Sequence, residues 1–294
     1  MKKLFQWVMA VTLICGTGVF TSCSVKDDLP VSPDQPEKGM PRVSKVYHGG
    51  SLVWKKNVMG SWITVIDRVD ERALVDEYFW TGNRLDSIIE VTNNVIWDLE
   101  YDEQGRLVHQ VSRFGNDDYT YEYDSKGRLS KSFRSILYDE DGRFNRVVTE
   151  YIYNGDKLSK AVKHDTLDGE EGVSTEEDTY TWEGDNVVSL SIVRTDADGY
   201  VTEETITAEY STYLNPFKNF IPFLQKNFAL SLKDEMWIWS KNVPKAMSAS
   251  EKDHNEYDCK TTGDRITTFH SHLLAESETI FTEITSDYDI EYLD

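Results

Sequence analysis

YDEQGRL occupies residues 101–107 of the sequence, and YDSKGRL repeats it at residues 123–129. Each copy consists of an aromatic residue, an aspartate, two polar residues, a glycine, an arginine and a leucine. Asp and Gly tolerate the positive φ angles that tight hairpin turns need. The repeat therefore predicts successive β-hairpins built on one design.

Related copies extend the pattern in both directions. A third full copy, YDEDGRF, lies at residues 138–144, and shortened copies occur as WTGNRL at 80–85, YNGDKL at 153–158 and WEGDNV at 182–187. Turn signals that recur at short, regular spacing indicate an all-β meander. Within each hairpin, the aromatic and the aliphatic residue are expected to meet on the core side.

The runs between the turns alternate between apolar and polar side chains. Tyr119 and Tyr121 share one face of a predicted strand, whereas Thr120 and Glu122 share the other. Such alternation, with one polar face, is typical of a half-buried antiparallel sheet. The predicted fold is mainly all-β, with a single domain over residues 44–294 that forms a curled antiparallel β-meander or half-barrel.

One segment carries a helical pattern instead. Asn215 can cap a helix and Pro216 suits its first position. The apolar residues that follow have helical spacing: Phe217, Phe220, Ile221, Leu224 and Phe228. Pro222 interrupts the pattern, so we expect one short, kinked helix. It packs on the concave face of the sheet, either as plain core or as a plug on a lipid-binding cavity.

The hairpin repeats resemble the tyrosine-aspartate (YD) repeats of Rhs and teneurin proteins over residues 78–190. In those families, long arrays of such hairpins wrap a closed shell around a cargo, and this chain has too few copies for that. With a lipobox-like FTSC at residues 20–23, LNPF at 214–217 and SKNVP at 240–244, the chain resembles an uncharacterised outer-membrane lipoprotein family of Bacteroidales. That resemblance implies no assigned activity.

The amino terminus reads as a secretory signal. Two lysines precede an apolar run over residues 4–20, which is the pattern of an export signal. The tetrapeptide FTSC at residues 20–23 resembles the lipobox of bacterial lipoproteins, with phenylalanine in place of the usual leucine. That resemblance implies removal of residues 1–22 and acylation of Cys23. An ordinary cleavable signal with an incidental cysteine is the alternative.

A polar segment follows the cysteine. Lys26, Asp27 and Asp28 resemble the export signal that sends Bacteroidetes lipoproteins to the outer face of the outer membrane. The alternative is the start of a plain polar linker. Four of the seven prolines fall between residues 30 and 41, so residues 23–43 are predicted as the acylated cysteine and an extended spacer. The expected location is the outer membrane, with a lipid anchor and the domain facing the exterior.

The charge balance narrows the range of partners. The 294 residues include 52 acidic and 31 basic ones, a formal net charge of −21. Nucleic-acid binding is not expected, because it needs a basic surface. The expected membrane contact is the acyl chain on Cys23 rather than a basic face. Cys259 would be the one thiol left in the mature chain, so no internal disulfide is predicted.

Candidate residues for chemistry are few. Trp237 and Trp239 would share one face of a strand, and indoles stack on sugar rings, so they are a possible glycan platform; core packing is the favoured alternative. His270 and His272 have the spacing of ligands on one strand face but lack the further ligands that zinc needs. We therefore predict no metal and no cofactor. The acidic turn at residues 196–199 fits a hairpin better than a calcium loop.

Three functions remain, in order of preference. The first is a lipid-anchored binding or scaffold protein of the cell surface, with an extracellular glycan or protein ligand. The second is a periplasm-facing carrier whose apolar half-barrel cavity holds a lipid or a lipoprotein acyl chain. The third is a glycan-acting surface hydrolase, which would need two carboxylates in one cleft. Catalysis is not the expected role, because the sequence contains no nucleophile elbow, phosphate-binding loop or zinc-protease motif.

Overall fold

The computed structural model describes most of the chain beyond the amino-terminal segment. The described residues are 42–113, 117–137, 144–167, 174–222, 234–263, 265–277 and 280–293. Cys23, Lys26, Asp27 and Asp28 lie outside them, as does most of the repeat copy at residues 138–144. Within the described part, no helix has the length and apolar character needed to cross a bilayer.

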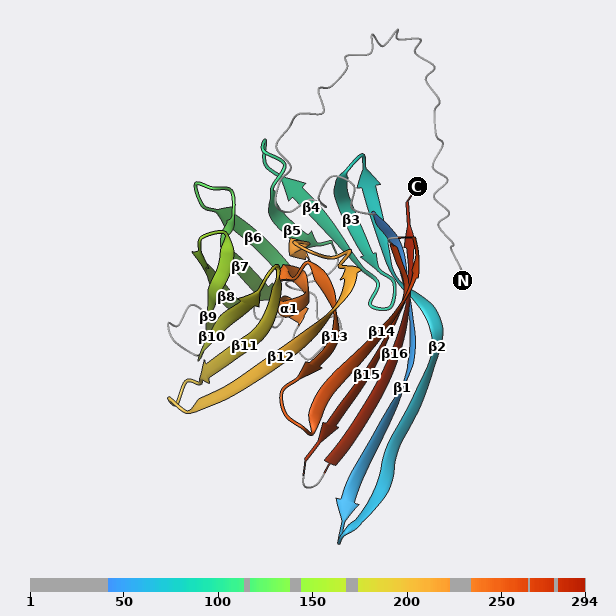
Figure 1. The fold of residues 1–294 in the computed structure, drawn as a ribbon. Coiled ribbons are helices and arrows are strands. Elements are labelled where there is room, and N and C mark those ends of the chain that lie inside the picture. Colours follow the sequence, from blue (N-terminus) through green and yellow to red (C-terminus); the bar gives the residue numbers. More distant parts are fainter. Residues whose placement is uncertain are drawn as a thin grey trace, which may run out of the picture. The chain divides into compact units, whose positions relative to one another are not determined.

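Sixteen strands of the described residues form one antiparallel sheet that closes into a barrel (Figure 1). In chain order they are β1 (Val43–Val58), β2 (Ser61–Thr81), β3 (Arg84–Glu90), β4 (Val95–Tyr101), β5 (Leu107–Ser112), β6 (Asp117–Tyr123), β7 (Leu129–Leu137) and β8 (Phe144–Asn154). The others are β9 (Lys157–Leu167), β10 (Ser174–Glu183), β11 (Asn186–Thr195), β12 (Val201–Leu214), β13 (Asn242–Ser248), β14 (Asp253–Thr262), β15 (Arg265–Glu276) and β16 (Ile280–Tyr292). Each strand pairs with its neighbours in the chain, so the topology is a meander.

The predicted half-barrel is wrong in one respect, because the sheet closes on itself. β1 and β16 pair from Val43↔Tyr292 to Lys56↔Ile280. Closure removes the two open edges that a half-barrel would leave at its first and last strands. The alternation within each strand predicts which side faces inward, but it carries no information on whether the first and last strands meet.

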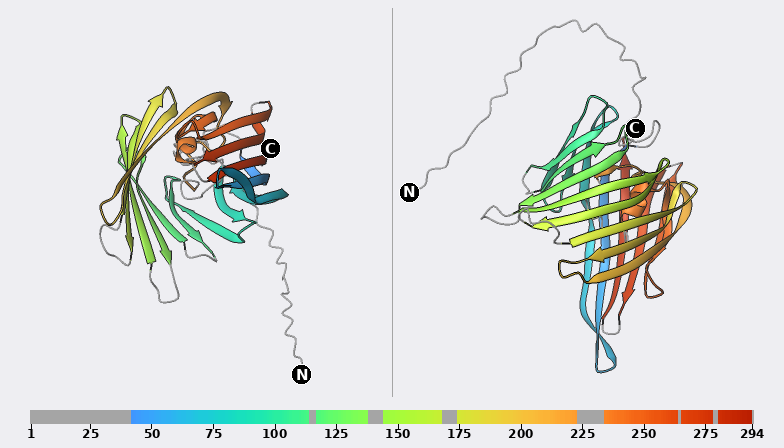
Figure 2. Two further views of the ribbon diagram at one scale, coloured as in Figure 1. Left: turned by 90° about the horizontal axis from the view of Figure 1, so that it is seen from below. Right: turned by 90° about the vertical axis from the view of Figure 1, so that its left-hand side faces the viewer.

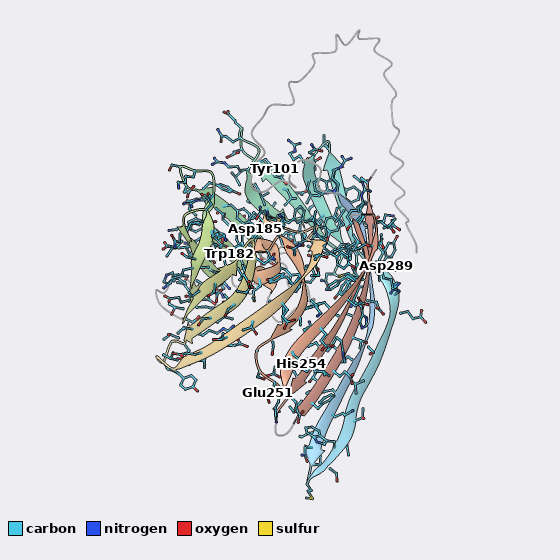
Figure 3. The ribbon with its side chains drawn as sticks, viewed as in Figure 1. Tyr101, Trp182, Asp185, Glu251, His254 and Asp289 are labelled. Atoms are coloured by element: carbon cyan, nitrogen blue, oxygen red, sulfur yellow. The ribbon has the colours of Figure 1, made fainter. Side chains whose placement is uncertain are left out.

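The turns divide into two groups, one at each end of the barrel (Figures 1 and 2). The repeat rim holds the turns at residues 82–83, 102–106, 124–128, 155–156 and 184–185. The far rim holds the turns at residues 59–60, 91–94, 196–199 and 249–252. In Figure 3, Tyr101 and Trp182 lie toward the repeat rim, and Glu251 lies toward the far rim. Because β1 begins at Val43, the chain enters the barrel at the repeat rim.

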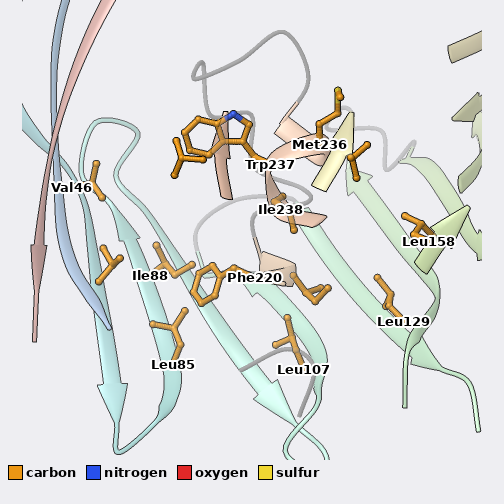
Figure 4. Close-up of a cluster of buried hydrophobic side chains, with 14 of the residues drawn as sticks. Val46, Leu85, Ile88, Leu107, Leu129, Leu158, Phe220, Met236, Trp237 and Ile238 are labelled. Carbon is orange, nitrogen blue, oxygen red and sulfur yellow. The ribbon is translucent and has the colours of Figure 1, made fainter. Parts of the chain in front are cut away.

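The hydrophobic core fills the interior behind the repeat rim (Figure 4). The aliphatic residue that ends each repeat copy points inward and is almost fully buried: Leu85, Leu107, Leu129, Leu158 and Val187. These side chains surround a short helix, α1 (Asp234–Trp239), and the segment at residues 215–222. Because the repeat copies share one spacing, they place a ring of aliphatic side chains around α1 and residues 215–222.

The predicted helix after Asn215 is not formed over the residues described. Asn215 does cap a turn, because its Oδ1 accepts a hydrogen bond from the Phe217 amide at 2.9 Å. The chain then makes tight turns up to Pro222, and residues 223–233, which include the rest of the predicted helix, lie outside the described part. Ile221 and Pro222 adopt a 3-10 turn, and Pro222 has no backbone N–H to donate to an α-helix at this point.

Hydrogen bonds from one hairpin to the next hold the repeat rim together. Aromatic side chains at this rim donate to the backbone carbonyl of a buried aliphatic residue in the preceding hairpin or, for Trp80, in β1. Tyr101 donates to Leu85 at 2.7 Å, and Tyr123 donates to Leu107 at 2.7 Å. Further members are Trp182 to Leu158, Tyr210 to Val187, Tyr292 to Ile266 and Trp80 to Val43, all between 2.6 and 2.8 Å. The expected meeting of aromatic and aliphatic residues thus also joins neighbouring hairpins.

The aspartate and the arginine of the repeat also stabilise the turns of the repeat rim. Asp124 Oδ1 accepts from the amides of Lys126 and Arg128 at 2.8 and 3.0 Å, which closes the turn. Its Oδ2 accepts from Arg128 Nε at 2.8 Å. The Arg128 guanidinium then lies 4.3 Å from the ring centroid of Tyr153 in the next hairpin. Gly127 adopts φ +78°, a conformation that favours glycine.

Candidate functional site

The inner face of the barrel changes character toward the far rim. Strands β8 to β12 carry charged and hydroxyl side chains at positions in phase with the buried core residues. Glu176 on β10 pairs in register with Lys163 on β9 and with Arg194 on β11. Cross-strand partners share one face of a sheet. These side chains therefore lie next to one another inside the barrel.

Lys163 is the centre of a partly buried charge network. Its Nζ lies 2.6 Å from Glu176 Oε1, 3.1 Å from Glu235 Oε1 and 3.4 Å from Asp178 Oδ2. Glu235 comes from α1, so the network also ties the helix to the sheet. Arg194 contacts the other carboxylate oxygen of Glu176 and, at 3.2 Å, Glu204 Oε2.

The network favours one charge state for its lysine. Burial lowers the pKa of Lys163, but the charges of Glu235, Asp178 and Glu176 outweigh it and hold the pKa well above its usual range. The ammonium therefore stays protonated at neutral pH. Burial, and after it the charge of Asp178, raises the pKa of Tyr180 well above its usual range, so its phenol stays neutral.

A polar pocket of about 510 Å³ lies over this network. Its lining includes Lys163, Asp165, Ser174, Glu176, Arg194 and Thr202. This volume lies within the range of small-molecule sites. Tyr200, in the far-rim turn before β12, also lines it. Hydroxyl groups and an excess of carboxylates over cations suit a ligand that donates hydrogen bonds through hydroxyl or amino groups.

The apolar part of the interior offers much less space. An apolar hollow lined by Phe217, Trp237, Val243 and Phe269 has a volume of about 20 Å³. A hollow needs roughly 10–15 Å³ of such volume to hold one water molecule, so this one has room for about one. The core around α1 is thus packed at this point, and an acyl chain does not fit the hollow.

The prediction that Trp237 and Trp239 lie together on a strand is wrong. Both belong to α1, where residues two apart point to different sides. Trp237 is 5% exposed and lies in the hydrophobic core (Figure 4). Its ring packs against Phe269 and Tyr257, with ring centroids 4.8 and 5.7 Å away. Trp239 instead lines a cleft of about 290 Å³ at the repeat rim, with Tyr153 and Trp182. The two indoles therefore do not form one platform.

The two candidate histidines are held by separate carboxylates. His270 Nδ1 lies 2.8 Å from Asp287 Oδ1, and His272 Nε2 lies 2.9 Å from Glu283 Oε1. Across the described ranges, no group of three or more His, Cys, Asp or Glu side chains is placed to hold a metal ion. In the acidic turn at residues 196–199, Asp196 Oδ1 accepts from the amides of Asp198 and Tyr200, as in a hairpin turn.

Cys259 is a half-buried free thiol on β14. Burial, with a smaller contribution from Asp258, raises the pKa of its thiol to about 12. The thiolate, which is the reactive form, is therefore scarce at neutral pH. Burial therefore disfavours a nucleophilic role for Cys259.

Solved structures that resemble this barrel include two porin-like proteins. A porin-like protein from Bacteroides vulgatus matches 86% of this chain and 99% of its own, with a TM-score of 0.51 and 10% identity. A porin-like protein from Bacteroides uniformis matches 85% of this chain and 96% of its own, with a TM-score of 0.45 and 16% identity. The first likeness establishes a shared fold. No protein-family model matches the chain, and no curated protein matches it.

The charge network was missed in the sequence, although a signal for it exists. Lys163 lies two residues after the buried Ala161, and Glu176 two residues before the buried Asp178. Charged residues in phase with the core face of a strand mark a polar interior. Their convergence on one lysine depends on strand register and on α1, neither of which the local pattern contains.

Proposed function

We propose that this chain is a lipid-anchored binding protein of the outer membrane, which faces the cell exterior and takes up a polar ligand through its far-rim pocket. The observation that carries the proposal is the pocket of about 510 Å³ over the Lys163 network. Buried charges cost stability unless they are fully paired. Functional sites are where such an arrangement is most often retained.

The outer face of the barrel supports attachment through an anchor. Side chains that point outward at mid-strand include Thr120 and Glu122 on β6, both exposed. Outward ion pairs join Lys131 to Glu150 at 2.8 Å and join neighbouring strands elsewhere. Barrels that cross a membrane have the opposite arrangement, with an apolar outer band and a polar interior. Acylation of Cys23, rather than insertion of these strands, would therefore hold the domain at the membrane.

The topology supports an outward-facing pocket. The chain enters the barrel at the repeat rim, and the pocket lies toward the far rim. Between Cys23 and Arg42 there are 18 residues, which can span at most about 60 Å. An anchor at Cys23 therefore does not hold the pocket itself against the membrane.

The pocket favours a glycan-like or amine-bearing ligand over an acyl chain. Its lining donates and accepts hydrogen bonds, whereas the apolar hollow near α1 measures about 20 Å³. This weighs against the lipid-carrier alternative. It leaves glycan hydrolysis as a second candidate, because two carboxylates, Asp165 and Glu176, line the same pocket.

Protease shaving of intact cells tests the location. A tagged chain is compared with a K26A/D27A/D28A variant, before and after the outer membrane is opened. Cleavage of the unmodified chain on intact cells, with protection of the variant, supports the export signal. Protection of both until the membrane is opened would place the domain in the periplasm and overturn the surface location.

A steric substitution tests the pocket. Thr202→Trp fills it from β12, and Thr205→Trp, on the outward face of the same strand, is the matched control. Both positions are exposed, so neither change should unfold the barrel. We expect Thr202→Trp, but not Thr205→Trp, to abolish binding to a panel of glycans and amines. Equal binding by both tryptophan variants would rule the pocket out as the binding site.

A separate measurement addresses hydrolysis. Release of products from a bound glycan, with loss of that release in Glu176→Gln, would favour the hydrolase instead.

A further inference from the structure

The β1–β2 hairpin extends past the other far-rim turns (Figure 1 and Figure 2, right). Pairing between β1 and β16 stops at Lys56↔Ile280. Beyond that point, Asn57 to Trp62 pair only with one another among the described residues. We call residues 54–64 the hairpin tip.

The hairpin tip exposes apolar side chains that the core does not use. Met59, at the turn, is fully exposed, and Val58, Trp62 and Ile63 are 42%, 42% and 50% exposed. Trp54 follows at 37%. Five large apolar side chains within one projecting turn form a concentrated patch, and such patches mark interaction sites.

The apolar side chains lie on both faces of the hairpin tip. Ile63 is paired with Lys56 and shares its face with Val58, whereas Trp62 is paired with Asn57 on the other face. Met59 lies at the apex between them. A protein partner docked on one face would leave the other face in water. A lipid interface surrounds a projecting hairpin and covers both.

The charge of this segment also fits a lipid surface. Residues 43–66 contain no acidic residue, although the chain has 52. Lys55 and Lys56 lie directly behind the apolar residues, one on each face. Long lysine side chains can extend toward headgroups while their stems stay in apolar surroundings, and indoles favour the same interfacial depth. Although the whole chain has a net charge of −21, the hairpin tip is therefore locally basic.

We infer that the hairpin tip is a membrane-interface element that inserts Met59, Trp62 and Ile63 into an anionic lipid surface. β1 has 16 residues, a length of about 53 Å. A spacer of up to about 60 Å lets the barrel lie along the membrane that holds the anchor. This reach depends on the anchor proposed above, whereas lipid binding by the hairpin tip does not.

A fluorescent label tests the inference in the full chain. Met59→Cys is made in a Cys259→Ala background, labelled with an environment-sensitive dye and reconstituted into vesicles of equal parts phosphatidylcholine and phosphatidylglycerol. The matched control carries the label at Asp198→Cys, an exposed position in another far-rim turn. The Cys259→Ala chain alone gives the background from any unacylated Cys23.

We expect a shift to shorter emission wavelength at position 59 and none at position 198. Pure phosphatidylcholine should give a weaker shift. Replacing Lys55 or Lys56 with Gln should lower the equilibrium constant for insertion about fivefold each. Emission at position 59 that stays as in water, or an equal shift at position 198, would overturn the inference. Acylation of Cys23 is checked separately by mass spectrometry of the purified chain, so a missing anchor is distinguished from a hairpin tip that does not insert.

Discussion

The repeat rim and the far rim end the same strands, yet different interactions hold them. At the repeat rim, the turns contribute buried aliphatic residues, and the two full copies at residues 101–107 and 123–129 add an aspartate that closes the turn and a tyrosine bonded to the preceding hairpin. At the far rim, the turn at residues 196–199 keeps the aspartate pattern, but Tyr200 and Val201 are exposed. The side chains of the repeat rim therefore stabilise the fold, whereas those of the far rim are available for contacts outside the barrel.

The turn Tyr123–Leu129 and the turn Asp196–Val201 make this difference measurable. Each has an aspartate at its first turn position, an aromatic residue and an aliphatic residue. Of these two turns, only in the first do the aromatic and aliphatic side chains have partners in the barrel core or the preceding hairpin. Matched substitutions in the two turns should thus differ in their effect on the free energy of unfolding.

The largest difference is expected for the aliphatic residue. Leu129 is 2% exposed, and Val201 is 49% exposed. Leu129→Ala leaves a cavity in the ring around α1 and should lower the free energy of unfolding by about 2–5 kcal/mol. Val201→Ala should change it by less than about 0.5 kcal/mol. Urea denaturation of both variants checks this, and equal midpoints would show that the repeat leucines are not structural.

A smaller difference is expected for the aspartate. Asp124 accepts from two amides and from Arg128, whereas Asp196 accepts from two amides and has no arginine four residues later. Asp124→Ala should therefore lower the free energy of unfolding by about 1–2 kcal/mol more than Asp196→Ala. If the two variants lose equal stability, the arginine of the repeat makes no net contribution.

The effect of Asp124 should also depend on pH. Burial raises the pKa of Asp124, but hydrogen bonds from Arg128 and the Lys126 amide outweigh it and leave the pKa lowered. A carboxyl with a lowered pKa stabilises the fold above its unfolded pKa of about 3.9, and the contribution is lost as pH falls through the folded value. The gap in unfolding midpoint between the unmodified chain and Asp124→Ala should thus narrow below about pH 4. A gap that is constant with pH would contradict the ionic part of this account.

The sequence was enough to predict the repeat rim but not the closed interior. YDSKGRL contains the turn, its glycine and its buried leucine, because these are local features. Tyr210 and Tyr292 make the same inter-hairpin bonds without the Gly-Arg signature, so the pattern did not reveal them. Trp237-Ile238-Trp239 fits a strand as well as a helix over three residues, and burial around it decided for α1.

The far-rim pocket could not be predicted for a different reason. Lys163, Glu176 and Glu235 come from β9, β10 and α1, and only the folded chain brings them together. Each is unremarkable in its own segment of an acidic chain. A local pattern predicts which way a side chain points, whereas a site built from three elements depends on how those elements pack.

The smallest difference is expected for the aromatic hydroxyl. Tyr123 donates to the Leu107 carbonyl at 2.7 Å, and Tyr123→Phe removes that bond while keeping the ring. The free energy of unfolding should fall by about 0.5–1.5 kcal/mol. Tyr200→Phe is the control, because its side chain is 68% exposed and water replaces whatever the hydroxyl contacts. If both changes are neutral, the rings alone hold neighbouring hairpins in register; if only Tyr123→Phe destabilises, the inter-hairpin bond is what distinguishes the repeat rim.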